Sequence, residues 1–228
     1  MSNLITALVG EQLEEGEDDK WCGTLAAPNG SVYGIPWEAA SVAKFNPVEK
    51  SITHVGPDFV GGTKWYRGAM TDSGVIYCPP YDDDRGILKI DTNTDTATEL
   101  DRNLLPEQGV MLHSSAAALD GCIYFMPSVA LRIMKLDPNN NDAMSSVGDD
   151  LGGGFIYIGT VVGIDGCVYG IPFGSKPIVK YDSINDITSF VGEKFDEGFG
   201  CKGNGVSARD GYIYALAKDD RVLKIDCQ

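Results

Sequence analysis

Short runs of alternating apolar and polar residues, separated by tight turns, fill most of this 228-residue chain. Runs such as SVYGIP and GILKID are rich in β-branched and aromatic residues, and Asn-Gly, Ser-Gly or Asp-Gly pairs stand between them. A period of two with such turns is typical of antiparallel β-hairpins, whereas an amphipathic helix needs a period near 3.6. The pattern therefore predicts an all-β protein.

One phrase, an aromatic strand that follows a turn, occurs five times at intervals of 44 to 47 residues. Its tyrosines are Tyr33, Tyr77, Tyr124, Tyr169 and Tyr214. An apolar-Lys phrase follows each of them, a third strand-like piece follows the first four, and a further piece precedes each tyrosine. Four antiparallel strands in about 45 residues is the size of a β-propeller blade, so five units predict a five-bladed β-propeller.

The fifth unit lacks its outermost strand, and a matching phrase stands at the opposite end of the chain. ITALVGEQLEEG at residues 5–16 repeats ITSFVGEKFDEG at residues 187–198. We expect residues 5–10 to complete the last blade, because this pairing closes the ring and leaves no open strand edge. The chain is then a single domain, 1–228. Its predicted blades are 20–56, 64–100, 110–148, 155–192, and 200–228 plus 5–10.

The wording of the first unit, KWxG…APNGxVYGIPxxAxxVxKFNP, resembles a tandem repeat found in uncharacterised propeller-like proteins. The number and length of the units resemble five-bladed propellers such as the tachylectins. This resemblance covers nearly the whole chain and implies a propeller fold. It implies no activity, because enzymes, lectins and adaptors share that scaffold.

Composition narrows the classes of function. The formal net charge of −15 repels phosphates, so we expect no nucleic-acid partner. The sequence has no apolar run of membrane-spanning length and no signal-peptide pattern, so we expect a soluble, intracellular protein, most simply a monomer. The six cysteines are too widely spaced for a metal site or a disulfide scaffold, and we expect them to be reduced.

One face of the predicted propeller is rich in acids. Its loops carry twenty of the 33 acidic residues, and aromatic residues flank the same loops. This combination favours a non-catalytic binding or scaffolding module that uses the acidic, aromatic face to bind a basic protein or a cationic ligand. The candidate ligand-binding residues are Trp21, Trp37, Trp65, Tyr81, Tyr157, Phe173, Asp82, Asp83 and Asp219.

Other hypotheses stay open. Aromatic rings beside carboxylates can stack on sugars, so the tryptophans and Tyr81 also suit a lectin-like carbohydrate binder. Packing between blades also accounts for the aromatic positions, and simple solvation also accounts for the acidic loops. A third hypothesis is a hydrolase, but the predicted inner strands lack the paired carboxylates that glycosidases use, and we expect no catalytic residue.

Three polar features complete the predictions. His113 stands beside two serines, but neighbours on a strand face opposite sides, so we expect it to line the channel or to pack. DTNTDT at 91–96 lacks the Gly and Glu of a calcium loop, so we expect Asx turns and neither metal nor cofactor. Most lysines of the apolar-Lys phrases have an Asp two residues later, so we expect same-face ion pairs such as Lys89 with Asp91.

Overall fold

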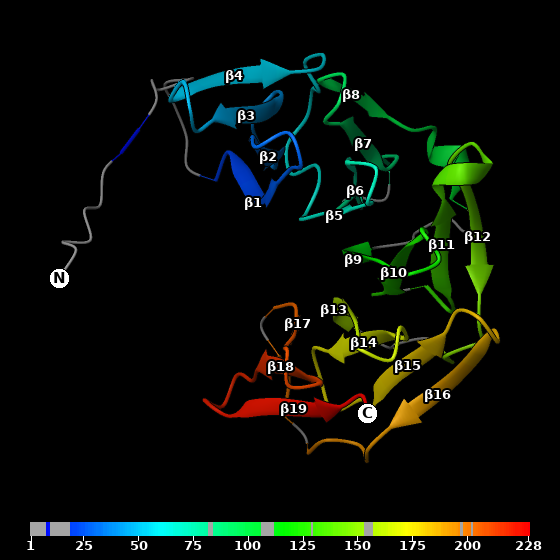
Figure 1. The fold of residues 1–228 in the computed structure, drawn as a ribbon. Coiled ribbons are helices and arrows are strands. Elements are labelled where there is room, and N and C mark those ends of the chain that lie inside the picture. The colour runs from blue at the N-terminus through cyan, green and yellow to red at the C-terminus, as the bar shows by residue number, and fades with distance from the viewer. Residues whose placement is uncertain are drawn as a thin grey trace, which may run out of the picture.

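The computed structural model consists almost entirely of antiparallel β-strands in five sheets (Figure 1). It describes residues 8–9, 19–81, 84–105, 112–128, 130–152, 157–196, 198–201 and 203–228. The sheets follow one another along the chain and around an arc, and the first strand of each sheet lies toward the middle (Figure 1). The predicted all-β class and antiparallel hairpins are therefore confirmed.

Four sheets have four strands each, and the fifth has three among the described residues. The first sheet contains β1 (Trp21–Ala26), β2 (Val32–Pro36), β3 (Val42–Asn46) and β4 (Ser51–Val55). The second contains β5 (Ala69–Met70), β6 (Val75–Cys78), β7 (Leu88–Asp91) and β8 (Thr96–Glu99). The third contains β9 (Leu112–Ala117), β10 (Ile123–Pro127), β11 (Ile133–Asp137) and β12 (Ala143–Val147). The fourth contains β13 (Tyr157–Val162), β14 (Val168–Pro172), β15 (Ile178–Asp182) and β16 (Ile187–Val191). The fifth contains β17 (Val206–Ser207), β18 (Tyr212–Leu216) and β19 (Val222–Asp226).

The same backbone pairing recurs in every sheet where the innermost segment meets the end of the second strand. The paired residues are Trp21 with Pro36, Trp65 with Pro80, Leu112 with Pro127, Tyr157 with Pro172, and Cys201 with Ala217. In the first, third and fourth sheets the register shifts next to this pair, as at a β-bulge. The recurring pair brings the segments before each inner strand and after each second strand side by side.

The apolar core consists of four clusters, and each lies between two successive sheets. The first, for example, joins Ile35 of β2 to Leu88 of β7, both without exposed surface. Among the described residues no such cluster joins the fifth sheet to the first, and Leu216 and Val222 of the fifth sheet are exposed. The predicted closing strand lies outside the described residues except for the exposed Leu8 and Val9, which belong to no strand.

A tyrosine, a carboxylate and a lysine meet in each of the first four sheets. In the second sheet the Tyr77 hydroxyl donates to Asp142 at 2.6 Å, and Lys89 Nζ lies 2.5 Å from the other carboxylate oxygen. The expected pairing of Lys89 with Asp91 is wrong. Asp91 instead accepts the backbone N–H of Asn93, which is the Asx turn that the sequence predicts.

We call each group of tyrosine, carboxylate and lysine a triad, and the sheet that supplies its carboxylate differs between units. In the third and fourth sheets it comes from the sheet's own Asp-Gly turn, as Asp120 and Asp165. The first two units have Asn29 and Ser73 at that turn position, and their lysines pair with Asp95 and Asp142 of the next sheet. These two ion pairs therefore link neighbouring sheets.

Candidate ligand-binding site

Four partly exposed aromatic rings meet where the first three sheets converge. Trp37 follows β2, Tyr66 precedes β5, Tyr81 follows β6, and His113 lies in β9. The ring centre of Trp37 lies 4.6 Å from that of Tyr81 and 5.6 Å from that of Tyr66, in edge-to-face geometry. His113 stacks on Tyr81 with ring centres 5.5 Å apart. We call these four residues the aromatic cluster.

The aromatic cluster is built from two positions of the repeat. Tyr66 and His113 each follow the residue that pairs with the proline at the end of the second strand, and Trp37 and Tyr81 each follow that proline. Successive residues of extended backbone face opposite sides, so the burial of Trp65 turns Tyr66 toward the other side. Local strand geometry thus sorts the rings between core and surface.

Lys64 holds the two loops of the cluster together. Its backbone N–H donates to the carbonyl of Trp37 at 3.0 Å, and its carbonyl accepts the N–H of Tyr81 at 2.8 Å. Its side chain is fully buried and donates at 3.1 Å to the backbone oxygens of Glu38, Gly61 and Gly62. Because both ring-bearing segments are bonded to one buried residue, the spacing of Trp37 and Tyr81 is fixed by the fold.

Arg67 adds a positive charge beside the rings. Its guanidinium lies 5.0 Å from the ring centre of Tyr66, and a Cβ placed on Gly203 would lie 3.6 Å from it. The side chain thus extends from the second sheet to the segment that precedes β17. Among the described residues no carboxylate forms an ion pair with Arg67. Its backbone adopts a φ of 60°, and its N–H donates to the carbonyl of Cys22 at 3.1 Å.

His113 has an unpaired polar atom beneath this surface. Its Nε2 is buried and has no hydrogen-bond partner among the described residues. Burial lowers the pKa of His113 below its ordinary value, so the imidazole is neutral at pH 7. A neutral imidazole can donate or accept at Nε2 according to its tautomer.

The structure distributes the sequence-predicted residues over several environments. Trp37 and Tyr81 lie in the aromatic cluster. Trp65 and Tyr157 are fully buried and donate to backbone carbonyls, while the half-buried Trp21 donates to the carbonyl of Ser41. These three side chains pack between elements of the fold, which is the alternative that the sequence left open. Asp82 and Asp83 lie outside the described residues.

The last two predicted residues lie in the fourth and fifth sheets. Phe173, at the repeat position of Trp37 and Tyr81, is 37% exposed, and Lys218 Nζ lies 3.2 Å from its ring centre. Asp219 is exposed and forms a 2.5 Å ion pair with Arg221. Tyr66 and Arg67 are not among the predicted residues, although the phrase WYRG sets the second unit apart from the first, which has WCGT.

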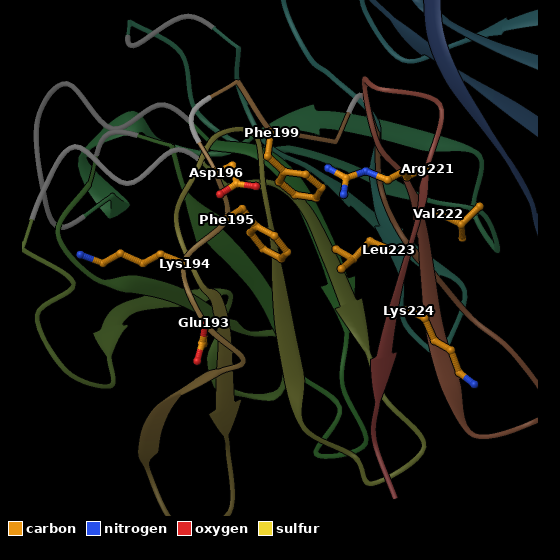
Figure 2. A pocket seen from close by; sticks show the side chains of 9 residues that line it. All are labelled: Glu193, Lys194, Phe195, Asp196, Phe199, Arg221, Val222, Leu223 and Lys224. Carbon is orange, nitrogen blue, oxygen red and sulfur yellow. The ribbon is translucent and has the colours of Figure 1, made fainter.

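A separate cavity of about 400 Å³ opens beside the edge strand β19. Phe195 and Phe199 stack with ring centres 3.9 Å apart, and Figure 2 shows them facing Leu223. The residues that line the cavity are Glu193, Lys194, Phe195, Asp196, Phe199, Arg221, Val222, Leu223 and Lys224 (Figure 2). The cavity therefore lies between the segment after β16 and the outer strand of the fifth sheet.

Successive antiparallel sheets with their first strands toward the middle define a β-propeller-like fold. No protein family and no curated protein sequence matches the chain. Virginiamycin B lyase from Staphylococcus aureus, as the catalytically inactive histidine-to-alanine form with quinupristin, is similar with a TM-score of 0.74 and 12% identity. The match covers 92% of this chain and 67% of the lyase. A streptogramin B lyase has a TM-score of 0.70 and 14% identity, over 90% of this chain and 68% of its own.

These similarities correct the expectation that the protein is not an enzyme. Two of the similar structures are lyases, so the fold does carry catalysis. Inner strands without paired carboxylates exclude the glycosidase mechanism and say nothing of other mechanisms. His113, which the sequence predicts to line the channel or to pack, lies half-buried on the inner strand β9.

The expected intracellular location gains no support. The extracellular domain of a two-component system protein from B. thetaiotaomicron has a TM-score of 0.71 and 13% identity, over 96% of this chain and 27% of its own. At such identities the likeness shows the fold, and this fold occurs in an extracellular domain. In the described part of the chain, no helix has the length and apolarity that a membrane crossing requires.

Proposed function

We propose that this propeller-like protein binds a carbohydrate ring on the aromatic cluster. The observation that carries the proposal is the meeting of four partly exposed rings with Arg67 beside them. The C–H faces of sugars stack on aromatic rings, and their hydroxyls need polar groups at the edge of the stack. The Arg67 guanidinium supplies such a group here.

A sugar fits this surface better than a cation or a basic protein segment. The guanidinium of Arg67 has no ion-pair partner among the described residues, so a second cation would meet an uncompensated positive charge. Two like charges about 4 Å apart repel by about 1 to 4 kcal/mol, depending on the local dielectric. A neutral or anionic ring avoids this repulsion.

Binding measurements test the proposal. A glycan array with the whole chain identifies the sugar, and calorimetry then compares the wild type with Trp37→Ala and Tyr81→Ala. We expect each variant to bind at least tenfold more weakly, which corresponds to about 1.4 kcal/mol, because each removes a stacking face. Phe173→Ala is the matched control, since Phe173 holds the same repeat position outside the aromatic cluster. Wild-type protein that binds no glycan, or a Trp37→Ala variant with unchanged affinity, contradicts the proposal.

We also propose that the fold is a five-bladed ring closed by residues 5–10 on β19. Support comes from the register of the fourth sheet, where Ile178 pairs with Val191 and Asp182 pairs with Ile187. Residues 5–10 repeat residues 187–192, and β19 corresponds to β15. The expected pairs are therefore Val222 with Val9, and Asp226 with Ile5.

The edge of the fifth sheet supports the same proposal. Val222 is 58% exposed on β19, and the apolar part of the adjacent cavity is formed by Phe195, Phe199 and Leu223 (Figure 2). An apolar strand edge of this kind is a site of uncontrolled pairing unless another strand covers it. Residues 5–10 can supply this strand, because they repeat the sequence of β16, the outermost strand of the fourth sheet.

Deletion and cross-linking test the closure. Without residues 1–12 we expect a lower melting temperature or dimerisation, because β19 then keeps a free edge. Leu8→Cys combined with Leu223→Cys should form a disulfide under oxidising conditions, whereas Leu8→Cys with Val206→Cys on β17 should not. A truncated chain that stays monomeric with an unchanged melting temperature, together with no specific cross-link, rules the closure out.

A further inference from the structure

We infer that the ring bound on the aromatic cluster carries a carboxylate, and that Arg67 recognises it. The ligand class is thus an acidic saccharide of the uronic acid type. This inference rests on the proposed carbohydrate binding and adds the charge of the bound sugar. The conformation, surroundings and charge of Arg67 support it.

The backbone of Arg67 is held where glycine is favoured. Arg67 has a φ of 60°, and Gly23, at the same repeat position in the first unit, has a φ of 99°. The other three units have Ser114, Gly159 and Gly203 at this position, and none of these has a positive φ, so the left-handed backbone is specific to the first two units. A non-glycine residue in the left-handed region is strained, and such strain concentrates at functional sites. Glycine would relieve the strain, so an arginine at this position points to a role for its side chain.

The neighbours of Arg67 leave room for this side chain. A Cβ on Gly23 would lie 3.3 Å from the Cα of Arg67, and a Cβ on Gly203 would lie 3.6 Å from its guanidinium. Two positions without side chains thus flank the arginine. Its guanidinium lies against the Tyr66 ring at 5.0 Å, which orients the plane of the group without using its N–H donors.

The charge of Arg67 is available to a ligand. Its guanidinium takes part in no ion pair with a described carboxylate, unlike Arg85, which pairs with Glu99. A planar guanidinium binds a carboxylate through two parallel N–H···O bonds, and the rings beside it supply the stacking face. The net charge of −15 acts mainly on the approach of the ligand, because salt screens it over about 8 Å at physiological ionic strength.

Matched ligands separate the charge from the ring. The probes are an oligogalacturonate and its fully methyl-esterified form, which keeps the rings and removes the charge. Calorimetry with the whole chain, at low and high salt, should show the acid binding at least tenfold more tightly than the ester. The preference should fall as the salt concentration rises.

Two variants attribute the preference to Arg67. Arg67→Gly, which matches Gly23, should lose at least tenfold more affinity for the acid than for the ester, because the ester loses only a bond to a neutral group, and it should melt no lower than the wild type. Arg67→Lys should recover part of the acid affinity, because it restores the charge without the planar fork.

The results distinguish the recognition of a carboxylate by Arg67 from carbohydrate binding on the aromatic cluster. Equal wild-type binding of acid and ester, or an Arg67→Gly variant that loses both equally, overturns the recognition of a carboxylate and leaves carbohydrate binding intact. Binding of neither probe, together with an empty glycan array, overturns both.

Discussion

Tyr77→Phe measures how strongly the triads that link neighbouring sheets stabilise the fold. The Tyr77 hydroxyl donates to Asp142 of the third sheet at 2.6 Å, and both residues are buried. Phenylalanine keeps the ring and removes one hydrogen bond to a charged acceptor. Such bonds contribute about 1.5 to 3 kcal/mol, and Lys89 still pairs with the carboxylate at 2.5 Å. We therefore expect the free energy of unfolding to fall by about 2 kcal/mol.

Urea denaturation at pH 7 gives this free energy, and calorimetry checks it. For a chain of this size a loss of about 2 kcal/mol lowers the melting temperature by roughly 4 to 8 °C. Tyr214→Phe is the matched control, because Tyr214 holds the same repeat position but donates at 2.8 Å to Asp210 at the surface of the fifth sheet. We expect a clearly smaller loss there. Equal losses for the two variants would refute the idea that burial between sheets strengthens this bond.

Three further outcomes follow from the structure. Burial alone would raise the pKa of Asp165, but hydrogen bonds from Lys180, Tyr169 and a backbone N–H outweigh it, and the pKa lies below its usual value. The contribution of Asp165 to the free energy of unfolding is thus complete above the unfolded pKa of about 3.9, and it is lost as the pH falls through the lower folded pKa. In urea titrations between pH 5 and 2, Asp165→Asn should therefore make the free energy of unfolding depend less steeply on pH. Lys64→Met should lower the unfolding free energy by about 3 kcal/mol, since three carbonyls lose a charged donor, and a wild-type melting curve would contradict this. Burial raises the pKa of the Cys78 thiol strongly, so a thiol reagent at pH 8 should spare it until urea unfolds the chain, while the half-buried Cys22 reacts earlier.

The strands could be predicted because their signals are local. Alternation of apolar and polar residues fixes which face of a strand is buried, and the Asn-Gly, Ser-Gly and Asp-Gly turns fix where hairpins reverse. The glycines of two such turns, Gly30 and Gly121, have φ values of 83° and 79°, as these reversals require. The repeated tyrosine phrase thus located the second strand of every sheet.

The candidate site could be predicted only in part. Aromatic bulk beside loops indicated Trp37 and Tyr81, but it indicated the buried Trp65 equally strongly. Its neighbour Tyr66 lies in the aromatic cluster, because extended backbone sends successive side chains to opposite sides. Knowing which of the two faces the core requires the position of the next sheet.

The amino-acid sequence by itself determined the strands, the turns and the five-fold repetition, since each depends on residues close together in the chain. Only the tertiary structure decided which residues from different sheets meet. Lys89 pairs with Asp142, which is 53 residues away, rather than with Asp91, which is two away. In the same way four rings and Arg67 gather from three sheets. Contacts between sheets depend on how the sheets are placed relative to one another, and no local pattern along the chain encodes that placement.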